Sequence, residues 1–364
     1  RPGASLQLTI DRDLQYEVQQ DLYAQMTAAH ADFAAAVVMQ VSTGQVLAQA
    51  SYPSYDADAY QDYPNTDYKD AATQVTVDPG SSAKIVTLGA ALNTGVIKPS
   101  TTVKIGPSIY KGGVRYQDDT PFPQGTKITI PGILAYSSNV GTITVASKLS
   151  KDTIYKYQRL FGLGQASGEG VQDESSGDLL PPNKWTATSW GSIPIGEGLA
   201  ATPLQMTAAY CAIANNGTYI QPSLIKGTVA AGGKVTPAPA PATHQVLTPQ
   251  VASQLRTALE AVTTAKGATA KRAAVKGYVI AGKTGTGLQV GPNGKYLPGN
   301  AISFIGMAPA NHPQYVIGVF AHVPSGTGGL YAAPAFRNMM TFTLQHFQVP
   351  PSGDKAPKFK LTVK

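Results

Sequence analysis

Cysteine is nearly absent from this chain of 364 residues, which contains only Cys211. A single thiol excludes an intramolecular disulfide framework and any metal site built on cysteine ligands. Cys211 stands in an apolar run, so we expect a small buried side chain there. Long hydrophobic runs are also missing, because no stretch approaches the roughly 18 apolar residues that a membrane-spanning helix needs. The chain opens at Arg1 without a signal peptide, and we expect a processed or engineered fragment whose targeting segment, if there is one, lies upstream.

Charged residues are scarce as well, at 13% of the chain, although their balance is basic. The 28 Lys and Arg residues against 21 Asp and Glu give a formal charge of +7, but most of them are dispersed along the sequence. Dispersed charge does not indicate nucleic acid as a partner. The one local cluster comprises Lys266, Lys271, Arg272 and Lys276, just before Lys283. It predicts either a positive approach for an anionic substrate or an ordinary charged loop.

Several common catalytic patterns are missing too. The sequence has no Gly-x-Ser-x-Gly elbow, no phosphate-binding loop and no Rossmann glycine fingerprint. No histidine stands in a recognisable catalytic or zinc-binding context, and each is interpreted as a surface or hydrogen-bonded residue. The histidines are His30, His244, His312, His322 and His346. We therefore expect neither a metal nor a cofactor.

Apolar residues are plentiful, at 43% of the chain, alongside 37 glycines and 27 prolines. This length and composition permit one large core with an attached subdomain, or two modest domains, in a loop-rich globular protein. Strand patterns lie at residues 6–10, 35–39, 45–50, 277–286, 301–308 and 314–322. Helical patterns lie at residues 14–26, 85–92, 251–262 and 334–346, and through much of 129–216. Strands at both ends with helices between them predict an α/β fold of the α+β kind, with one antiparallel sheet completed by the two termini.

Three further local features can be read from residue types. Asp11 or Asp13 is expected to cap the first helix. Residues 228–243 are rich in Pro and Gly and are predicted to form a loop. The tyrosine-rich segment 52–68 is predicted to be either a lid over a cleft or a surface loop.

Ser81 and Lys84 form the first of three short chemical motifs. The turn-forming residues Asp78-Pro79-Gly80 precede a helical pattern, so Ser81 is expected in the first turn of a helix. Lys84, three residues on, shares its face, so its amine can lie over the Ser81 hydroxyl and act as a base. Backbone N–H groups at the helix N-terminus favour a developing oxyanion. A lysine acts as a base only if burial or a second cation lowers its pKa, and Lys283 is a candidate for that cation.

A lookalike of this motif, Ser352-Gly-Asp-Lys355, stands in the C-terminal tail. It lacks a preceding turn and a helical pattern. We therefore interpret it as part of a flexible polar tail without chemical function.

The second motif, Ser137-Ser138-Asn139, lies in a polar gap between apolar segments. A hydroxyl and an amide two residues apart in a loop can both point into a cleft. There Ser137 can relay a proton and Asn139 can donate to a substrate carbonyl. Taken alone, the same three residues are far more typical of a helix cap or a turn.

The third motif, Lys283-Thr284-Gly285-Thr286, ends the strand predicted at 277–286. Gly285 permits a ligand or another backbone to approach closely. The strand edge can pair with an extended peptide, while Lys283 and the threonine hydroxyls bind a carboxylate. The alternative for this string alone is a hairpin end, but three such motifs in this order favour a single acyl-transfer site.

Together with other segments, these motifs resemble a known family. The chain is similar to the transpeptidase domain of a class B, monofunctional penicillin-binding protein of the bacterial division or elongation type. The segments that carry the resemblance are Leu8-Thr-Ile-Asp11, Pro79-Gly-Ser-Ser-x-Lys84, Ser137-Ser-Asn-Val140, Gly196-x-Gly-Leu-x-Ala-Thr-Pro-Leu-Gln205, Ala214-Asn-Asn-Gly217, Gly282-Lys-Thr-Gly-Thr286, Ser303-Phe-Ile-Gly306, Ala308-Pro309 and Ala333-Pro-x-Phe336.

The resemblance implies a penicillin-binding and serine β-lactamase-like fold, with a central antiparallel sheet flanked by helices and a mostly helical subdomain. It implies a transpeptidase domain over 1–347, with the helical subdomain at roughly 85–215, and a basic tail over 348–364. It also implies a membrane anchor and an N-terminal pedestal, which are not part of this chain. The expected location is the extracytoplasmic face of the bacterial membrane.

The resemblance further assigns roles to residues. Ser81 would be acylated by a D-Ala-D-Ala stem peptide or by a β-lactam, with Lys84 as base and Ser137 as proton shuttle. Asn139 would orient the peptide, and Lys283 with the segment Thr284-Gly285-Thr286 would hold its carboxylate. The backbone N–H groups of Ser81 and Thr286 would form the oxyanion hole. An amine would then attack the acyl-enzyme and close a peptidoglycan cross-link. The implied protein partners are a membrane glycosyltransferase and other cell-wall assembly proteins.

Five residues depart from the family pattern. Glu197 stands where Gln is usual, and Gly287 stands where Ala is common. Ala83 stands where a bulky residue often follows the nucleophile. The segment Lys69-Asp70-Ala71 stands where Asn-Arg-Ala is usual. These changes bear on β-lactam affinity and donor preference rather than on the reaction class. Two alternatives share the motifs. One is a serine β-lactamase, although no Glu suitably placed to activate a deacylating water is recognised; the other is a non-catalytic scaffold or β-lactam-binding decoy.

Overall fold

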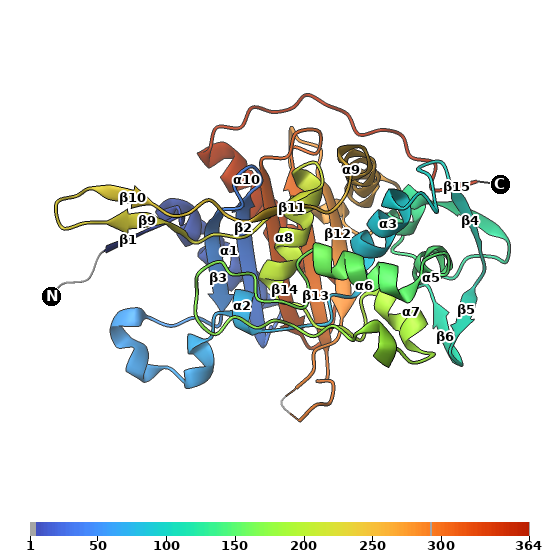
Figure 1. The fold of residues 1–364 in the computed structure, drawn as a ribbon, viewed down its shortest axis with the longest axis horizontal. Helices are drawn as coiled ribbons and strands as arrows, with labels where there is room; N and C mark the ends of the chain where they lie inside the picture. The colour runs from blue at the N-terminus through green and yellow to red at the C-terminus, as the bar shows by residue number, and fades with distance from the viewer. Residues whose placement is uncertain (1–4, 292, 364) are drawn as a thin grey trace.

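The computed structural model describes residues 5–291 and 293–363 and is centred on a five-stranded antiparallel sheet (Figure 1). Its strand order is β12-β13-β14-β2-β3. The strands are β2 (Phe33–Gln40), β3 (Val46–Tyr52), β12 (Ala281–Gly287), β13 (Asn300–Ala308) and β14 (Tyr315–Val323). Because β14 pairs with β2, strands from both ends of the chain complete one sheet, as the sequence predicted. The strand predicted at 277–286 corresponds to β12. Its predicted start at 277 is wrong, since β12 begins at Ala281.

Helices cover both faces of this sheet. Helix α1 (Arg12–Ala28) packs with α10 (Ala332–His346), and α8 (Pro203–Ala214) contacts β2, β13 and β14. Register pairs Gly306 with Ile317 and Gly318 with Ile305, so the two glycines lie on opposite faces. A Cβ at Gly306 would be 2.7 Å from the Phe336 ring of α10. A Cβ at Gly318 would be 2.2 Å from Thr207 Oγ1 of α8, so each face carries a glycine that lets a helix approach closely.

The first helix illustrates how local sequence sets an element boundary. The Asp11 carboxylate accepts a hydrogen bond from the Leu14 backbone N–H at 2.9 Å and caps α1. Leu14, Val18, Leu22 and Met26 are buried along one face, which matches the predicted helical period. Asp11, rather than Asp13, is therefore the cap.

The region between the two parts of the sheet contains both helices and short strands. The helices are α2 (Ala71–Gln74), α3 (Lys84–Asn93), α4 (Ile130–Ala135), α5 (Asn139–Ala146), α6 (Lys151–Leu160) and α7 (Ser189–Ser192). The strands are β4 (Thr102–Ile105), β5 (Ser108–Lys111), β6 (Val114–Gln117) and β7 (Thr126–Thr129). Of these, α3, α4 and α5 lead to or from the predicted site residues.

The Pro/Gly-rich segment is not the simple loop that composition predicted. Strand β9 (Ile225–Val229) turns through Gly233, at φ 80°, into β10 (Val235–Pro237), and β1 (Ser5–Leu8) pairs with the other edge of β9. The prediction failed because the alternating residues around the glycines pair with each other across the turn. This three-stranded sheet projects at the left of Figure 1. A separate two-stranded sheet joins β8 (Thr218–Ile220) to β11 (Thr243–Gln245).

The tyrosine-rich segment forms a separate surface loop. Two 3₁₀ turns, Ala57–Asp62 and Asn65–Tyr68, bring Tyr55 into edge-to-face contact with Tyr68, at 5.0 Å between ring centroids. No tyrosine of this loop lines the cavity that contains Ser81. The segment is a surface loop and does not cover that cavity. Tyr55 and Tyr68 line a separate cavity of about 330 Å³.

The C-terminal tail crosses the molecule instead of hanging free. After α10 it runs past α9 (Pro249–Thr264), along the top of Figure 1, and ends in β15 (Thr362–Val363), which pairs with β7. Leu361 is only 8% exposed, and its carbonyl accepts a hydrogen bond from the Thr129 N–H at 3.0 Å. Ser352 and Lys355 lie in an irregular stretch, so the lookalike motif is not on a helix. Apolar and backbone contacts hold the end of the tail, beyond the stretch that contains the lookalike motif.

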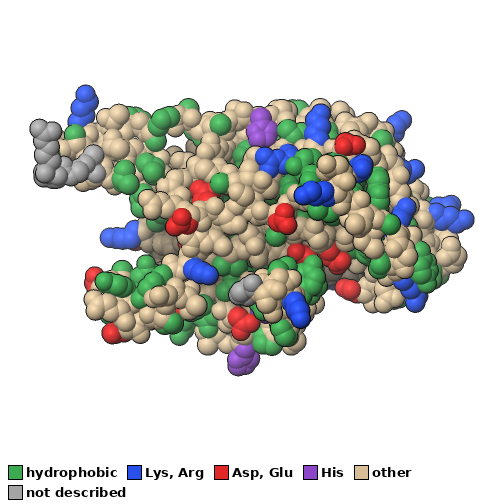
Figure 2. Space-filling view, turned by 60° about the horizontal axis from the view of Figure 1, so that its bottom comes forward, with side chains coloured by type: hydrophobic (Ala, Val, Ile, Leu, Met, Phe, Trp, Pro, Cys, Tyr) green, Lys and Arg blue, Asp and Glu red, His purple; other side chains and the backbone are tan. Residues whose placement is uncertain are grey.

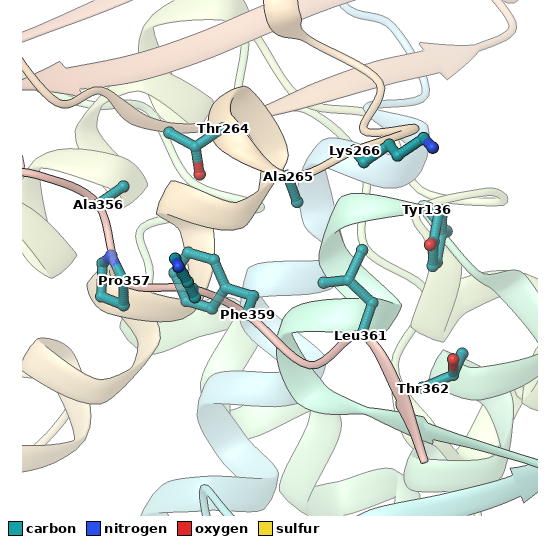
Figure 3. A pocket seen from close by; sticks show the side chains of 10 residues that line it. Tyr136, Thr264, Ala265, Lys266, Ala356, Pro357, Phe359, Leu361 and Thr362 are labelled. Atoms are coloured by element: carbon teal, nitrogen blue, oxygen red, sulfur yellow. The ribbon is translucent and has the colours of Figure 1, made fainter. Parts of the chain in front are cut away.

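A cavity of about 500 Å³ lies between the tail and the end of α9 (Figure 3). Phe359 and Leu361 of the tail line it together with Tyr136 and Lys266. We call it the tail cavity.

Neither a basic patch on the face shown in Figure 2 nor a membrane-spanning helix is found among the described residues. Lys and Arg side chains are scattered over the face shown in Figure 2 rather than gathered into one patch. Among residues 5–291 and 293–363, no helix has the length and apolar character that a membrane span requires.

Candidate active site

Ser81 is presented by a 3₁₀ turn, Gly80–Ala83, that runs directly into α3. The turn lies against strand β12. Gly80 has φ 51°, and a Cβ there would be 2.2 Å from the Thr286 carbonyl oxygen. A Cβ at Gly285 would be 2.7 Å from the Pro79 carbonyl oxygen. These two glycines therefore let the nucleophile turn and the strand end touch, and Ser81 stands at the start of the helix as predicted.

Ser82, the residue after Ser81, anchors the turn to the core. Ser82 is fully buried, and its hydroxyl donates to the Pro79 carbonyl at 2.7 Å. The Tyr210 hydroxyl, from α8, donates to the Ser82 carbonyl at 2.8 Å. The backbone on both sides of Ser81 is thus fixed to the core of the domain.

Lys84 is fully buried beneath the site. Its amine donates to the Ser137 carbonyl at 2.5 Å, to Asn139 Oδ1 at 2.7 Å and to Ser137 Oγ at 3.4 Å. In the described part of the chain, its hydrogen bonds thus run to the second motif rather than to the Ser81 hydroxyl. Burial lowers the pKa of Lys84 to about 7, against the opposing charges of Asp118, Asp119 and Glu197.

Lys283 is the second buried amine, and it reaches the same serine. Its Nζ donates to Ser137 Oγ at 2.9 Å, to the Thr284 carbonyl at 2.9 Å and to Thr284 Oγ1 at 3.2 Å. Burial holds the pKa of Lys283 well below its usual range, and the charge of Lys84 lowers it further. From the sequence, Lys283 is a candidate for the cation that lowers the pKa of Lys84. The structure instead assigns the lowered pKa of Lys84 to burial, because its amine is removed from water.

Ser137 lies between the two amines in a left-handed backbone conformation, with φ 57°. Ser138 follows it and faces away from the cavity. Its hydroxyl accepts a hydrogen bond from the Gly141 N–H at 2.9 Å, so Ser138 is the cap of α5, and it donates to Asp118 Oδ2 at 2.7 Å. The string Ser137-Ser138-Asn139 is therefore both a site loop and a helix cap.

A cavity of about 580 Å³ joins the three motifs. It is lined by Ser81, Asp119, Ser137, Asn139, Ile195, Glu197, Thr269, Thr284, Thr286, Asn300, Gly326, Thr327 and Gly329. All three predicted motifs contribute to it. The amines of Lys84 and Lys283 reach the cavity through their hydrogen bonds to Ser137, which lines it. We call it the serine cavity.

The basic cluster before Lys283 is not part of this cavity. Lys271, Arg272 and Lys276 do not line it, and Lys266 lines the tail cavity instead. The Arg272 guanidinium donates to the Leu330 carbonyl at 3.4 Å. The segment lies beside the cavity, which Thr269 lines, and both interpretations of the basic cluster stay predictions.

Several lining residues were not recognised in the sequence as site residues. They are Asp119, Ile195, Thr269, Asn300, Gly326, Thr327 and Gly329, while Glu197 was noted only as a departure from the family pattern. The glycines after Thr327 offered a signal. A Cβ at Gly328 would be 2.0 Å from the Ser303 carbonyl oxygen, and one at Gly329 would be 2.2 Å from the Thr269 carbonyl oxygen. The glycine pair thus permits this loop to approach strand β13 and the segment around Thr269 closely.

Asp118 is a supporting residue that sequence reasoning also missed. It is 3% exposed, and besides Ser138 it accepts a hydrogen bond from the Val140 N–H at 2.9 Å. This carboxylate thereby holds both sides of Asn139. The Asn139 amide donates to the Gln117 carbonyl at 3.2 Å, which adds a further restraint to the loop.

Comparison with known proteins identifies the family of this chain. The profile of the family described as "Penicillin binding protein transpeptidase domain" matches residues 34–341. The chain belongs to this family. It is 37% identical to the penicillin-binding protein PbpB of Mycolicibacterium smegmatis over 99% of this chain and 57% of that protein. It is 30% identical to the peptidoglycan D,D-transpeptidase FtsI of Escherichia coli over 96% of this chain and 58% of that protein.

Solved structures of penicillin-binding transpeptidase domains share the fold. Penicillin-binding protein 3 of Mycobacterium tuberculosis, in complex with aztreonam, superposes with a TM-score of 0.92 and 34% identity, covering 100% of this chain and 82% of that one. The transpeptidase domain of Burkholderia pseudomallei penicillin-binding protein 3 gives a TM-score of 0.82 at 30% identity, over 97% and 99% of the two chains. These comparisons confirm the predicted fold class and the family resemblance. The chain spans only 57% and 58% of the two curated relatives named above.

Proposed function

We propose that this domain is a D,D-transpeptidase that cross-links peptidoglycan stem peptides through an acyl-enzyme on Ser81. The observation that carries the proposal is the meeting of two buried amines, those of Lys84 and Lys283, on one hydroxyl, that of Ser137, in the cavity lined by Ser81. Buried amines of lowered pKa are suited to accept protons from a weak nucleophile such as serine. The family membership and the names of the relatives support the same reaction.

In the proposed acylation, Ser81 Oγ attacks the carbonyl carbon between the two terminal D-alanines of the donor peptide. Because the pKa of Lys84 is lowered to about 7, about half of its amine is neutral at neutral pH, and the neutral form accepts the Ser81 proton. Ser137 then relays a proton to the leaving amine of the terminal D-alanine. The 2.9 Å and 3.4 Å hydrogen bonds of Ser137 Oγ to the two lysine amines support this relay. A β-lactam would acylate the same hydroxyl but would keep its leaving group tethered.

The remaining cavity residues bind and orient the donor in this proposal. The backbone N–H groups of Ser81 and Thr286 form the oxyanion hole, because the nucleophile turn lies against the end of β12. Lys283, Thr284 and Thr286 receive the donor carboxylate, with Gly285 keeping the strand edge close to the peptide. The Thr284 hydroxyl also donates to Thr269 Oγ1 at 3.0 Å, which places a further hydroxyl at this end of the cavity. Asn139 orients the donor amide.

The second half of the reaction is attack by an amine of a neighbouring stem peptide on the Ser81 ester. We propose that this takes place at the extracytoplasmic face of the bacterial membrane. A segment upstream of Arg1 would hold the domain there, and a membrane glycosyltransferase and other cell-wall assembly proteins would be its partners. The family membership, and the greater length of the relatives, support this arrangement. We also propose the division into a domain at 1–347, with a subdomain at 85–215, and a tail at 348–364.

Incubation with a fluorescent penicillin, followed by mass spectrometry of the labelled peptide, tests the acyl-enzyme step. We expect a stable adduct on Ser81. Absence of labelling, or labelling at another residue, would contradict the proposed nucleophile. Cross-linking of lipid-linked peptidoglycan by the full-length protein then tests the second step, and a labelled protein that forms no cross-links would be a β-lactam-binding decoy.

One observation supports keeping the β-lactamase alternative in the same experiment. Glu197 lines the serine cavity, and burial raises the pKa of its carboxyl. A carboxylate in this position can in principle activate a water molecule. Rapid release of the penicillin adduct would favour a β-lactamase, whereas retention over hours would favour the transpeptidase.

A further inference from the structure

Glu197 is fixed to the nucleophile turn on both sides. The Gly80 N–H donates to the Gly196 carbonyl at 2.9 Å, and a Cβ at Gly196 would be only 2.0 Å from the Gly80 carbonyl oxygen. On the other side, the Gly198 N–H donates to Asp78 Oδ2 at 3.1 Å. Because residues 78 and 80 lead directly into Ser81, the backbone of Glu197 holds a fixed position relative to the nucleophile.

The Glu197 side chain lines the serine cavity without a protein partner of its own. Its carboxylate accepts no hydrogen bond from any residue that the structure describes, although its backbone N–H donates to the Ser192 carbonyl at 3.1 Å. Asp78 lies beside it and is 3% exposed, with its Oδ2 also accepting from the Tyr296 hydroxyl at 3.1 Å. Burial and the charge of Asp78 raise the pKa of Glu197, while the charge of Lys84 opposes this shift. A partly desolvated carboxylate beside another acid gains most from a cation with N–H donors.

The proposed reaction brings such a cation to the cavity in its second step. The acceptor is a primary amine, and an alkylamine with a pKa of about 10 is an ammonium ion at neutral pH. An ammonium ion has no lone pair with which to attack the Ser81 ester. The acceptor therefore needs an anion that binds it and a base that takes one proton. Of the two lining carboxylates, Asp119 is exposed to solvent, whereas Glu197 is half-buried and anchored to the nucleophile turn.

We propose that Glu197 is the catalytic residue that binds the acceptor ammonium and accepts its first proton. This inference rests on the proposed transpeptidase function and adds the acceptor specificity of that site: a cationic primary amine rather than a neutral nucleophile. The nitrogen of the acceptor contacts the Glu197 carboxylate and, once deprotonated, attacks the ester carbon on Ser81.

The protons and charges of this step balance. The ammonium gives one proton to the Glu197 carboxylate, and the resulting amine forms the new C–N bond. The Ser81 C–O bond then breaks, and Ser81 Oγ receives the second proton of the nitrogen through Lys84 and Ser137, which are joined by the hydrogen bonds described above. The products are an amide, a free serine and a neutral Glu197 carboxylic acid, which returns its proton to water.

Partitioning of the acyl-enzyme between competing nucleophiles tests the proposal on the chain as described. A small N-acyl-D-alanyl thioester acylates Ser81, and D-alanine, methanol and water compete for the ester. The products are then separated as peptide, methyl ester and acid. For Glu197→Gln we expect the peptide-to-acid ratio to fall by about 100-fold, the scale of a lost general base. The ester-to-acid ratio should change by less than about twofold, because methanol carries no charge. The peptide-to-acid ratio of Glu197→Asp should lie between those of the wild type and Glu197→Gln.

Three results would overturn the inference. An unchanged peptide-to-acid ratio in Glu197→Gln would show that Glu197 does not serve the amine. A parallel loss of peptide, ester and acid formation would show that it activates nucleophiles of every kind, as in a β-lactamase. An equal loss of peptide in Asp119→Asn, the matched control at the other lining carboxylate, would show a general field effect of the cavity. If the wild-type chain releases no thiol from the thioester, the proposed function itself fails, which is a separate outcome.

Discussion

Two cavities of similar size in this domain are built in opposite ways. The serine cavity has a volume of about 580 Å³ and the tail cavity about 500 Å³. Threonines line both cavities, and lysines lie close to both. Under the serine cavity the lysines are fully buried and bonded to the site loop. In the tail cavity the lining lysines, Lys266 and Lys358, are exposed to solvent. Size alone therefore does not mark the reactive site.

The difference lies in how each cavity holds its charges. Lys84 and Lys283 have been removed from water, so their protonation responds to what enters the cavity. Exposed lysines such as Lys266 keep a solvated charge. The tail cavity instead borders a small apolar cluster of Ala135, Ala261 and Leu361. We expect the serine cavity to carry chemistry and the tail cavity to reflect how the chain end is packed.

The largest effect should come from the nucleophile. Ser81→Ala should abolish covalent labelling by fluorescent penicillin, a loss of at least about 10³-fold in rate, because it removes the proposed nucleophile. Ser352→Ala, in the lookalike motif beyond α10, is the matched control and should label like the wild type. Residual labelling of Ser81→Ala at wild-type rate would place the nucleophile elsewhere.

The buried amine should have the next largest effect. Lys84→Met should reduce the second-order rate of acylation by roughly 10²- to 10⁴-fold, the range for loss of a general base. The matched change in the tail cavity, Lys266→Met, should leave that rate within about twofold of wild type. Stopped-flow measurement of penicillin acylation compares the two. Equal losses in both variants would remove the distinction between buried and solvated lysines.

The pH dependence of acylation sharpens the same distinction. Lys84 must be neutral to accept the Ser81 proton, and its pKa is about 7. The acylation rate should therefore rise about tenfold for each pH unit below 7 and level off above it. Lys266→Met should keep this midpoint, since its charge is exposed. A rate that stays flat from pH 5 to pH 8 would show that Lys84 is not the base.

Sequence patterns predicted those parts of the site that depend on neighbouring residues. Asp78-Pro79-Gly80 ahead of an apolar period placed Ser81 at a helix start, and the structure has it there. Asp118 escaped prediction because its role lies in contacts with Ser138 and Val140, 20 and 22 residues away. Nothing in the local sequence around Asp118 records those contacts.

The error at the start of β12 has a similar origin. Tyr278, Val279 and Ile280 alternate like a strand, but Gly277, at φ 89°, turns the chain there. The Tyr278 hydroxyl donates to the Val349 carbonyl, and the Val279 carbonyl accepts from the Ala310 N–H at 2.9 Å. Tertiary contacts with the segments after α10 and β13 thus replace the ladder that the alternation predicted.

A smaller effect is expected when the chain end is loosened. Leu361→Ala should lower the free energy of unfolding by about 2 kcal/mol, because it empties space next to Ala135 and Ala261 in a small cluster. Leu6→Ala, at a leucine that is 57% exposed, is the matched control and should change it by less than about 0.5 kcal/mol. Denaturant titration measures both. Equal stability of the two variants would mean that the tail adds nothing to the fold.

The smallest effect should come from the lysines of the tail cavity. The double variant Lys266→Ala, Lys358→Ala should acylate with penicillin within about twofold of wild type, since exposed charges outside the serine cavity are screened by salt. The tail cavity nevertheless touches the active site through Tyr136, whose backbone precedes Ser137. A change in acylation rate would therefore show that packing around Tyr136 is transmitted to Ser137. In that case the two cavities would be energetically coupled, and the rate for Leu361→Ala should shift in the same direction.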